Sequence, residues 1–231
     1  MPSPKLLRRR SSKRPFRVAI LGQNGVGKSA LTVRFLTRRF IGDYDPLLEK
    51  VYSCCKFVGG ENVAIDLLDT AVQNENNRLL ENIRWADAYI LMYSVTDRCS
   101  FNECSRMKFL INAYRKRQRK IPDNESVASA FPVIMVGNQI DRDHDRMVTE
   151  QEGRKRANQL GCVAFYEISV RENADCVEKL FQDMYPLCKR SKKYWPVAEQ
   201  SQTVYFAAGT QTKLETTEEL ERRKNMLYTT N

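Results

Sequence analysis

Eight residues near the start of the chain have the types and spacing needed to hold a phosphate group. Gly22-Gln-Asn-Gly-Val-Gly-Lys28-Ser29 fits the pattern Gly-x-x-x-x-Gly-Lys-[Ser/Thr]. Glycines let backbone N–H groups curl around an anion without clashes from Cβ atoms. We expect Lys28 to reach the β- and γ-phosphates and the Ser29 hydroxyl to bind Mg²⁺. The nucleotide-binding residues predicted here are Asn24, Gly25, Val26, Gly27, Lys28, Ser29 and Ala30.

A second motif, Asn138-Gln-Ile-Asp141, follows the apolar segment 132–136. A carboxylate can accept two N–H bonds from one edge of guanine, an arrangement that adenine does not offer. On its own this spacing is weak and is usually just a turn. Placed after a phosphate-binding loop and at the carboxyl end of a parallel strand, it predicts a guanine site formed by Asn138, Gln139 and Asp141.

An acidic residue, Asp69, ends the segment Ile65-Asp66-Leu67-Leu68. An acid at this place matches the group that holds Mg²⁺ through water in phosphate-transferring proteins. We therefore expect Ser29 and Asp69 to be the metal-binding residues. The alternative is an acid that only terminates the strand.

The elements that would position these motifs alternate between short apolar runs and helical patterns. Strands are expected at 17–21, 51–56, 63–68, 89–93, 132–136 and 163–168. Helices are expected at 28–37, 101–115, 149–160 and 177–188, the third opened by the capping-box sequence Thr149-Glu-Gln-Glu152 and stopped by Gly161. This alternation predicts an α/β fold of the P-loop NTPase type, with a mainly parallel six-stranded sheet and helices on both faces.

The net charge of +10 lies mainly outside this core. Residues 1–15 hold six basic residues and no acidic ones, whereas residues 16–188 hold 24 basic and 23 acidic residues. We therefore expect a disordered basic tail at 1–15, a nucleotide-binding domain at 16–190 and a polar tail at 191–231, with a possible short helix at 217–227. Residues 115–131 are expected to form a polar insertion, whose basic start would be a solvated helix end.

The order of these motifs resembles that of the Ras superfamily of small GTPases over residues 16–188. Between the first two motifs lie Phe40, Tyr44-Asp-Pro46 and Asp69-Thr-Ala71 with Gln73, and after them comes Ser169. The stretch from Lys28 to Ile41, together with Tyr44-Asp-Pro46, is most similar to the branch of Ras-related, oestrogen-regulated growth inhibitors and similar Ras-like proteins.

The resemblance implies roles for further residues. Phe40 would pack against guanine, and Ser169, Val170 and Arg171 would form the loop that supports the base. Gln73 and Lys28 would be the catalytic residues, with Gln73 orienting the attacking water. Mg²⁺ would be the cofactor, with GTP or GDP as the ligand.

Several positions depart from the pattern of the superfamily. Leu47 stands where a Thr hydroxyl joins the Mg²⁺ shell, and Val72 stands where the family carries Gly. Asn24 adds bulk beside the γ-phosphate, and Gln139 replaces the usual Lys. Asn24, Leu47 and Val72 predict a GTPase with slow hydrolysis.

Two other interpretations stay open. The chain could be a non-switching adaptor that holds guanine nucleotide as a structural ligand, or a P-loop ATPase or kinase, which Asn138 and Asp141 disfavour. We expect a monomer in Ras-type signal transduction, with protein effectors and regulators that the sequence does not identify. Nucleic acid is not expected as the main partner.

The sequence also bears on where the chain acts. It ends Tyr228-Thr-Thr-Asn231, without a Cys-a-a-X box, so no prenyl anchor is expected and membrane contact would be weak and electrostatic. Seven irregularly spaced cysteines without Cys-x-x-Cys indicate thiols in a reducing compartment. The cytoplasm is expected, with a membrane surface or the nucleus as alternatives that the basic tail allows.

Overall fold

The computed structural model describes residues 14–40, 49–70, 76–119 and 132–191. The expected disordered tail before residue 14, the expected tail from residue 192 with its helix at 217–227, and most of the 115–131 segment lie outside these residues. The secondary structure runs β1 (Phe16–Leu21), α1 (Lys28–Thr37), β2 (Lys50–Val58), β3 (Glu61–Asp69), α2 (Asn76–Trp85), β4 (Ala88–Ser94), α3 (Arg98–Arg119), β5 (Val133–Asn138), η2 (Ile140–Asp145), α4 (Glu150–Gln159), β6 (Ala164–Ile168) and α5 (Ala174–Ser191).

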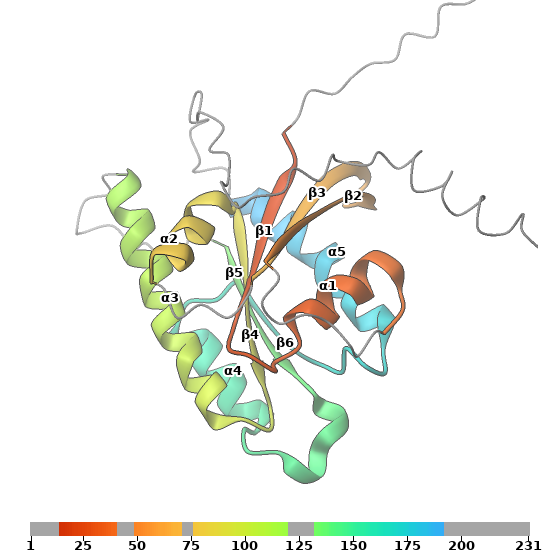
Figure 1. Ribbon diagram of the computed structural model, residues 1–231, viewed down its shortest axis with the longest axis vertical. Coiled ribbons are helices and arrows are strands. Elements are labelled where there is room, and N and C mark those ends of the chain that lie inside the picture. The colour runs from red at the N-terminus through yellow and green to blue at the C-terminus, as the bar shows by residue number, and fades with distance from the viewer. Residues whose placement is uncertain (1–13, 41–48, 71–75, 120–131, 192–231) are drawn as a thin grey trace, which may run out of the picture. The chain divides into compact units, whose positions relative to one another are not determined.

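The six strands form one sheet in the order β2-β3-β1-β4-β5-β6. Strands β2 and β3 pair antiparallel, and every other neighbouring pair is parallel. Helices α1 and α5 cover one face, while α2, α3 and α4 cover the other (Figure 1). The predicted fold class, a mainly parallel six-stranded sheet with helices on both faces, is confirmed.

Burial explains why the central strands are continuous apolar runs. All seven residues of β4 and all six of β5 are buried, because helices cover both faces of these strands. At the edge of the sheet, β2 alternates between exposed and half-buried side chains over most of its length. Two apolar clusters result, one on each face of the sheet, built around Leu31 and Phe181 on one side and Phe101 and Ile111 on the other.

Helix α4 begins and ends where the sequence predicted. The Thr149 hydroxyl accepts from the Glu152 N–H, and the Glu152 carboxylate accepts from the Thr149 N–H, which completes the capping box. Gly161 follows the helix with a φ of 64°, a left-handed conformation that glycine adopts without strain. Helix α2, in contrast, was missed by the sequence analysis.

Residues 115–119 form the end of α3, as expected of the basic start of the 115–131 segment. The expectation of a solvated helix end was wrong for Arg115. Arg115 is buried instead. Its Nε donates to the Tyr89 hydroxyl at 2.7 Å, and its guanidinium donates to the carbonyl of Ala86. The Tyr89 hydroxyl donates in turn to the carbonyl of Ile83 at 2.6 Å, so these two side chains occupy carbonyls at the end of α2.

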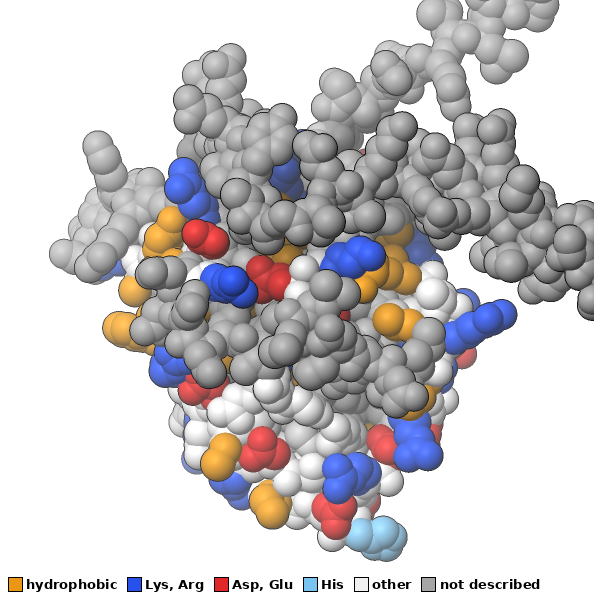
Figure 2. Space-filling model, viewed as in Figure 1, with side chains coloured by type: hydrophobic (Ala, Val, Ile, Leu, Met, Phe, Trp, Pro, Cys, Tyr) orange, Lys and Arg blue, Asp and Glu red, His pale blue; other side chains and the backbone are white. Residues whose placement is uncertain are grey.

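Positive and negative side chains are interspersed on the face of the described residues seen in Figure 2. Neither sign gathers into a large patch on this face, as expected from the nearly equal numbers of acids and bases in residues 16–188. Of the helices in the described part of the chain, none is both long and apolar enough to cross a membrane.

Candidate nucleotide-binding site

The predicted site residues converge because the parallel strands end at one level. Ile20 pairs with Asp69, and Asn138 pairs with both Ser94 and Ile168. The segments that follow these residues therefore leave the sheet along the same carboxyl edge, where open α/β sheets bind their ligands.

The loop between β1 and α1 needs its glycines. A Cβ at Gly22 would lie 2.3 Å from the carbonyl oxygen of Met92, and one at Gly27 would lie 2.4 Å from Asn138 Nδ2. Gly25 and Gly27 have φ angles of 75° and 100°, which side chains disfavour. The backbone therefore bends sharply before α1, at whose first turn N–H groups lack partners within the helix. Such a loop is suited to an anion.

Side chains hold three carbonyls of this loop. Lys28 Nζ donates to the Gln23 oxygen at 2.9 Å, Gln139 Nε2 to the Gly25 oxygen at 2.9 Å, and Asn138 Nδ2 to the Val26 oxygen at 2.8 Å. In a trans peptide the C=O and the following N–H point in opposite directions. The N–H groups that follow these carbonyls are thus directed to the other side of the loop.

Lys28 and Asp69 bring opposite charges into the floor of the site, and both are buried. Burial lowers the pKa of Lys28, an effect that the Asp69 carboxylate opposes. Burial likewise raises the pKa of Asp69, whereas the Ser29 hydroxyl and the Lys28 ammonium lower it.

One oxygen of Asp69, Oδ1, is buried without a hydrogen-bond partner among the residues that the structure describes. An unsatisfied buried carboxylate oxygen is costly, so a cation or its bound water suits this position. Ser29 and Asp69 together supply the hard oxygen donors that Mg²⁺ prefers.

Asn138 joins the phosphate loop to the loop after β6. Besides the bond to Val26, its Oδ1 accepts from the N–H of Val170 at 3.1 Å. The Ser169 hydroxyl donates to Asp141 Oδ1 at 2.7 Å and accepts from the N–H of Glu172. The Ser169 hydroxyl thereby orients the carboxylate of Asp141 through one of its two oxygens.

The sequence model of the Ras family matches residues 17–190 of this chain. The chain belongs to the Ras family. Membership implies the binding and hydrolysis of GTP.

Individual relatives are similar over most of their length. The human Ras-related and estrogen-regulated growth inhibitor is 39% identical over 177 residues, which are 77% of this chain and 81% of that protein. The Xenopus laevis Ras-like protein family member 11B is 40% identical over 190 residues, 79% of this chain and 71% of the relative. Human Ras-like protein family member 11A is 37% identical over 185 residues, 77% of this chain and 70% of the relative. The predicted similarity to the branch of Ras-related, oestrogen-regulated growth inhibitors and similar Ras-like proteins is confirmed.

The remaining predicted residues of this Ras-family chain differ in exposure, and some lie outside the described part. Ala30 and Val170 are buried, whereas Asn24 and Arg171 are exposed. Phe40 has 41% of its surface exposed. Gln73, Leu47 and Val72 lie outside the described residues, so their predicted roles stay predictions.

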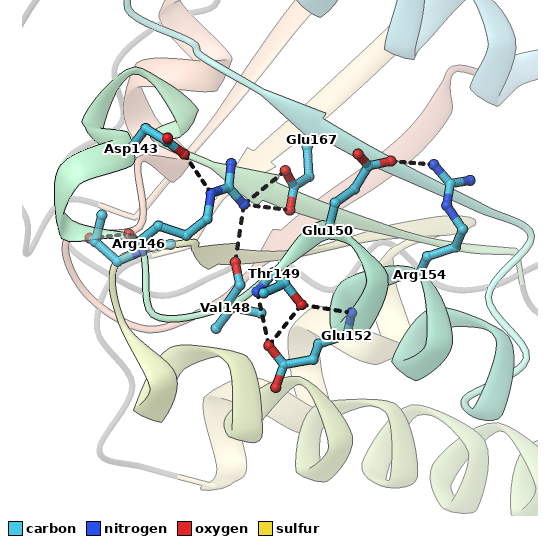
Figure 3. Close-up of polar contacts among 10 residues, drawn as sticks. Asp143, Arg146, Val148, Thr149, Glu150, Glu152, Arg154 and Glu167 are labelled. Atoms are coloured by element: carbon cyan, nitrogen blue, oxygen red, sulfur yellow. Dashed lines mark hydrogen bonds and ion pairs between the residues drawn. The ribbon is translucent and has the colours of Figure 1, made fainter.

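A set of charged residues that was not predicted from the sequence holds the segment after Asp141 in place. Arg146 donates to Asp143 at 2.8 Å, to the carbonyl of Val148 at 3.0 Å and to both oxygens of Glu167 at 3.0 and 3.1 Å (Figure 3). Arg98, at the start of α3, donates to Glu152 at 2.6 Å. The sequence shows that these residues are charged but not which of them pair, because Arg146 and Glu167 are 21 positions apart.

Proposed function

We propose that this Ras-family chain binds GTP and GDP with Mg²⁺ and slowly hydrolyses GTP to GDP and phosphate in a Ras-type signalling role. The observation that carries the proposal is the double contact of Asn138, which bonds the phosphate loop at Val26 and the loop after β6 at Val170. Asn138 thus joins a loop suited to phosphates to a loop suited to a base, and a nucleotide carries both groups.

At the phosphate end, the backbone N–H groups of residues 24–30 would surround the phosphates. The Lys28 ammonium, now bonded to the Gln23 carbonyl, could move its donors to a phosphate oxygen. Ser29 and Asp69 would hold Mg²⁺, Asp69 through water. When bound, Mg²⁺ supplies positive charge next to the β- and γ-phosphates.

At the base end, Asp141 would accept two N–H bonds from guanine, and Ser169 would keep its carboxylate in the right plane. Gln139 and Phe40 would pack against the base, while Val170 and Arg171 would form the loop under it. The Arg171 carbonyl accepts from the Arg34 guanidinium at 3.0 Å, a contact that ties this loop to α1.

Hydrolysis would depend on positioning and charge rather than on a covalent intermediate. Gln73 would align the attacking water, and Lys28 would stabilise negative charge that develops between the β- and γ-phosphates. Slow turnover is expected because Leu47 has no oxygen for Mg²⁺, Val72 restricts the backbone where Gly is usual, and Asn24 adds bulk.

Single-turnover hydrolysis of bound GTP tests this function. We expect slow conversion that falls roughly tenfold or more in Gln73→Leu, since that residue positions the water. Gln182→Leu, at an exposed position of α5, is the matched control and should keep the wild-type rate. Conversion that is indifferent to Gln73 would contradict the catalytic assignment.

The alternative function is a non-switching adaptor that holds guanine nucleotide without efficient hydrolysis. The same Leu47 and Val72 support it, because both weaken the link between the γ-phosphate and the loops that read it. Partner affinity measured with GDP and with a non-hydrolysable GTP analogue separates the two. Equal affinities would favour the adaptor.

The cellular setting is proposed from the sequence. A monomeric, cytoplasmic protein with protein effectors and regulators suits the family, and the basic residues 1–15 suit a weak, salt-sensitive contact with an anionic membrane or nuclear import. Loss of vesicle binding at raised salt, with full binding to effectors retained, would support the electrostatic contact.

A further inference from the structure

Four uncharged groups form a continuous chain of hydrogen bonds from the end of β4 to the phosphate loop. Thr96 Oγ1 lies 2.7 Å from Ser94 Oγ, and Ser94 Oγ lies 2.7 Å from Gln139 Oε1. Gln139 Nε2 lies 2.9 Å from the carbonyl oxygen of Gly25. Thr96 Oγ1 is also 3.3 Å from Gln139 Oε1. Ser94 is buried, so its hydroxyl depends on partners within the protein.

The Gly25 carbonyl determines how the Gln139 amide is oriented. The Gly25 carbonyl can only accept, so the amide nitrogen of Gln139 must face it and the amide oxygen must face Ser94. The Ser94 hydroxyl donates to this amide oxygen. The Ser94 oxygen accepts from the Thr96 N–H at 3.2 Å, and in the bond between the two hydroxyls either one can be the donor.

A lysine ammonium at position 139 would change the direction of the hydrogen bond with Ser94. An ammonium has three donors and no acceptor, so it could bond the Gly25 carbonyl but could accept nothing from Ser94. The Ser94 proton would have to turn away from residue 139. The glutamine amide, unlike an ammonium, accepts a hydrogen bond from Ser94 and donates one to Gly25 at the same time.

No side chain at position 25 restricts the Gly25–Val26 peptide. A Cβ built at Gly25 meets no atom within 4 Å, and the φ angle of 75° is one that glycine leaves easily. The Gln139 amide is therefore well placed to hold this peptide. Because the peptide is trans, a carbonyl fixed toward Gln139 directs the Val26 N–H to the opposite side of the loop.

We propose that Thr96, Ser94 and Gln139 act as one uncharged relay that positions the Gly25–Val26 peptide to bind a nucleotide phosphate. Ser94 and Thr96 are then positioning residues for phosphate binding, although neither touches the nucleotide. The inference rests on the proposed function, since it assigns the Val26 N–H to a phosphate of a bound guanine nucleotide.

The test compares nucleotides that differ only in the phosphates they present. Affinities for GDP and GMP are measured by competition against a fluorescent GDP analogue, for the wild type and for Gln139→Met, Ser94→Ala and Thr96→Val. We expect GDP affinity to fall roughly three- to tenfold in each variant, the range for one lost hydrogen bond, with a smaller change for GMP. General damage to the fold would weaken both ligands equally, and that result would overturn the relay.

A double-mutant cycle tests whether the residues act as one unit. If they do, Ser94→Ala combined with Gln139→Met should lose little more GDP affinity than Gln139→Met alone. Additive losses would overturn the relay. Gln182→Met on α5 is the matched control for the loss of an amide and should bind both nucleotides as the wild type does.

Two results separate the relay from the function on which it rests. Absence of guanine-nucleotide binding by the folded wild type would contradict the proposed function itself. Normal binding by the wild type, with unchanged affinities in all three single variants, would overturn the relay and leave the proposed function intact. Thr96→Val, which keeps the shape of the side chain, provides a readout if Ser94→Ala does not fold.

Discussion

The hydroxyl of Ser169 donates to the carboxylate of Asp141 across a distance of 2.7 Å. This bond connects the loop after β6 to the loop after β5, and it fixes the plane of the carboxylate proposed to read guanine. A carboxylate held by a neighbour loses less conformational freedom when its ligand binds. Base recognition should therefore depend on Ser169 as well as on Asp141.

Replacing Ser169 by alanine tests this dependence. We expect Ser169→Ala to release GDP roughly three- to tenfold faster, because one hydrogen bond that orients the carboxylate is lost. Stopped-flow release of a fluorescent GDP analogue measures the effect. Ser53→Ala is the matched control, since Ser53 makes a similar 2.6 Å bond to Asp66 on the β2–β3 hairpin. Equal effects of the two changes would argue against a special role for Ser169.

Arg146 should stabilise both the fold and the guanine site. Its contact with Glu167 is largely shielded, with 22% and 11% of the two side chains exposed. Arg146→Gln should lower the free energy of unfolding by about 1–3 kcal/mol, because a poorly solvated carboxylate loses its partner. GDP release should also become faster, since Arg146 fastens the segment that directly follows Asp141.

The control for Arg146 lies in the same segment. Arg142 pairs with Asp145, but both side chains are more than half exposed, so Arg142→Gln should change stability by less than about 1 kcal/mol. Urea unfolding of both variants gives the comparison. If Arg142→Gln proved as costly as Arg146→Gln, burial of the Glu167 contact would not be the cause.

The capping box of α4 predicts a component of stability that depends on pH. Hydrogen bonds from Arg98 and from Thr149 lower the pKa of Glu152 to about 2, below the ordinary value of about 4.3 for an unfolded chain. A lowered pKa stabilises the folded state above the unfolded value, and this stabilisation is lost as the pH falls through the folded value. Glu152→Gln should therefore be less stable than the wild type at neutral pH, with a difference that shrinks from about pH 4.5 toward pH 2.

Thermal melting at several pH values measures this difference. Arg98→Met should remove much of the same component, because Arg98 is the largest cause of the lowered pKa. A difference between wild type and Glu152→Gln that stayed constant down to pH 2 would show that the Glu152 charge is not responsible. Glu152 lies at the surface, where solvent screens the interaction.

Arg115 should contribute more to the stability of the fold than its place in a run of basic residues suggests. Arg115→Met keeps most of the apolar stem but removes the donors to Tyr89 and Ala86. We expect a loss of about 1–3 kcal/mol in the free energy of unfolding, the cost of leaving buried acceptors unsatisfied. Arg154→Met, which breaks an exposed pair with Glu150, is the control and should cost less than about 1 kcal/mol. Similar losses for both would contradict the buried role of Arg115.

Local patterns were enough to predict much of this protein. The phosphate loop, the capping box at Thr149 and the glycine stop at Gly161 depend on residues within a few positions of one another. Helix α2 was missed although its buried Leu79 and Ile83 lie at helical spacing, because no glycine follows it as Gly161 follows α4. The burial of Leu79 and Ile83 is seen in the folded protein, where α2 packs on the sheet.

The sequence by itself determined the order of the motifs, the alternation of strands and helices and the membership of the Ras family, since each follows from residue types at short or fixed spacing. Only the tertiary structure decided which groups orient the site. Asn138 reaches Val26 across 112 positions, and Gln139 reaches Gly25 across 114. Hydrogen bonds of this kind depend on the register of neighbouring strands, which brings distant residues within 3 Å and leaves no signal in the local sequence.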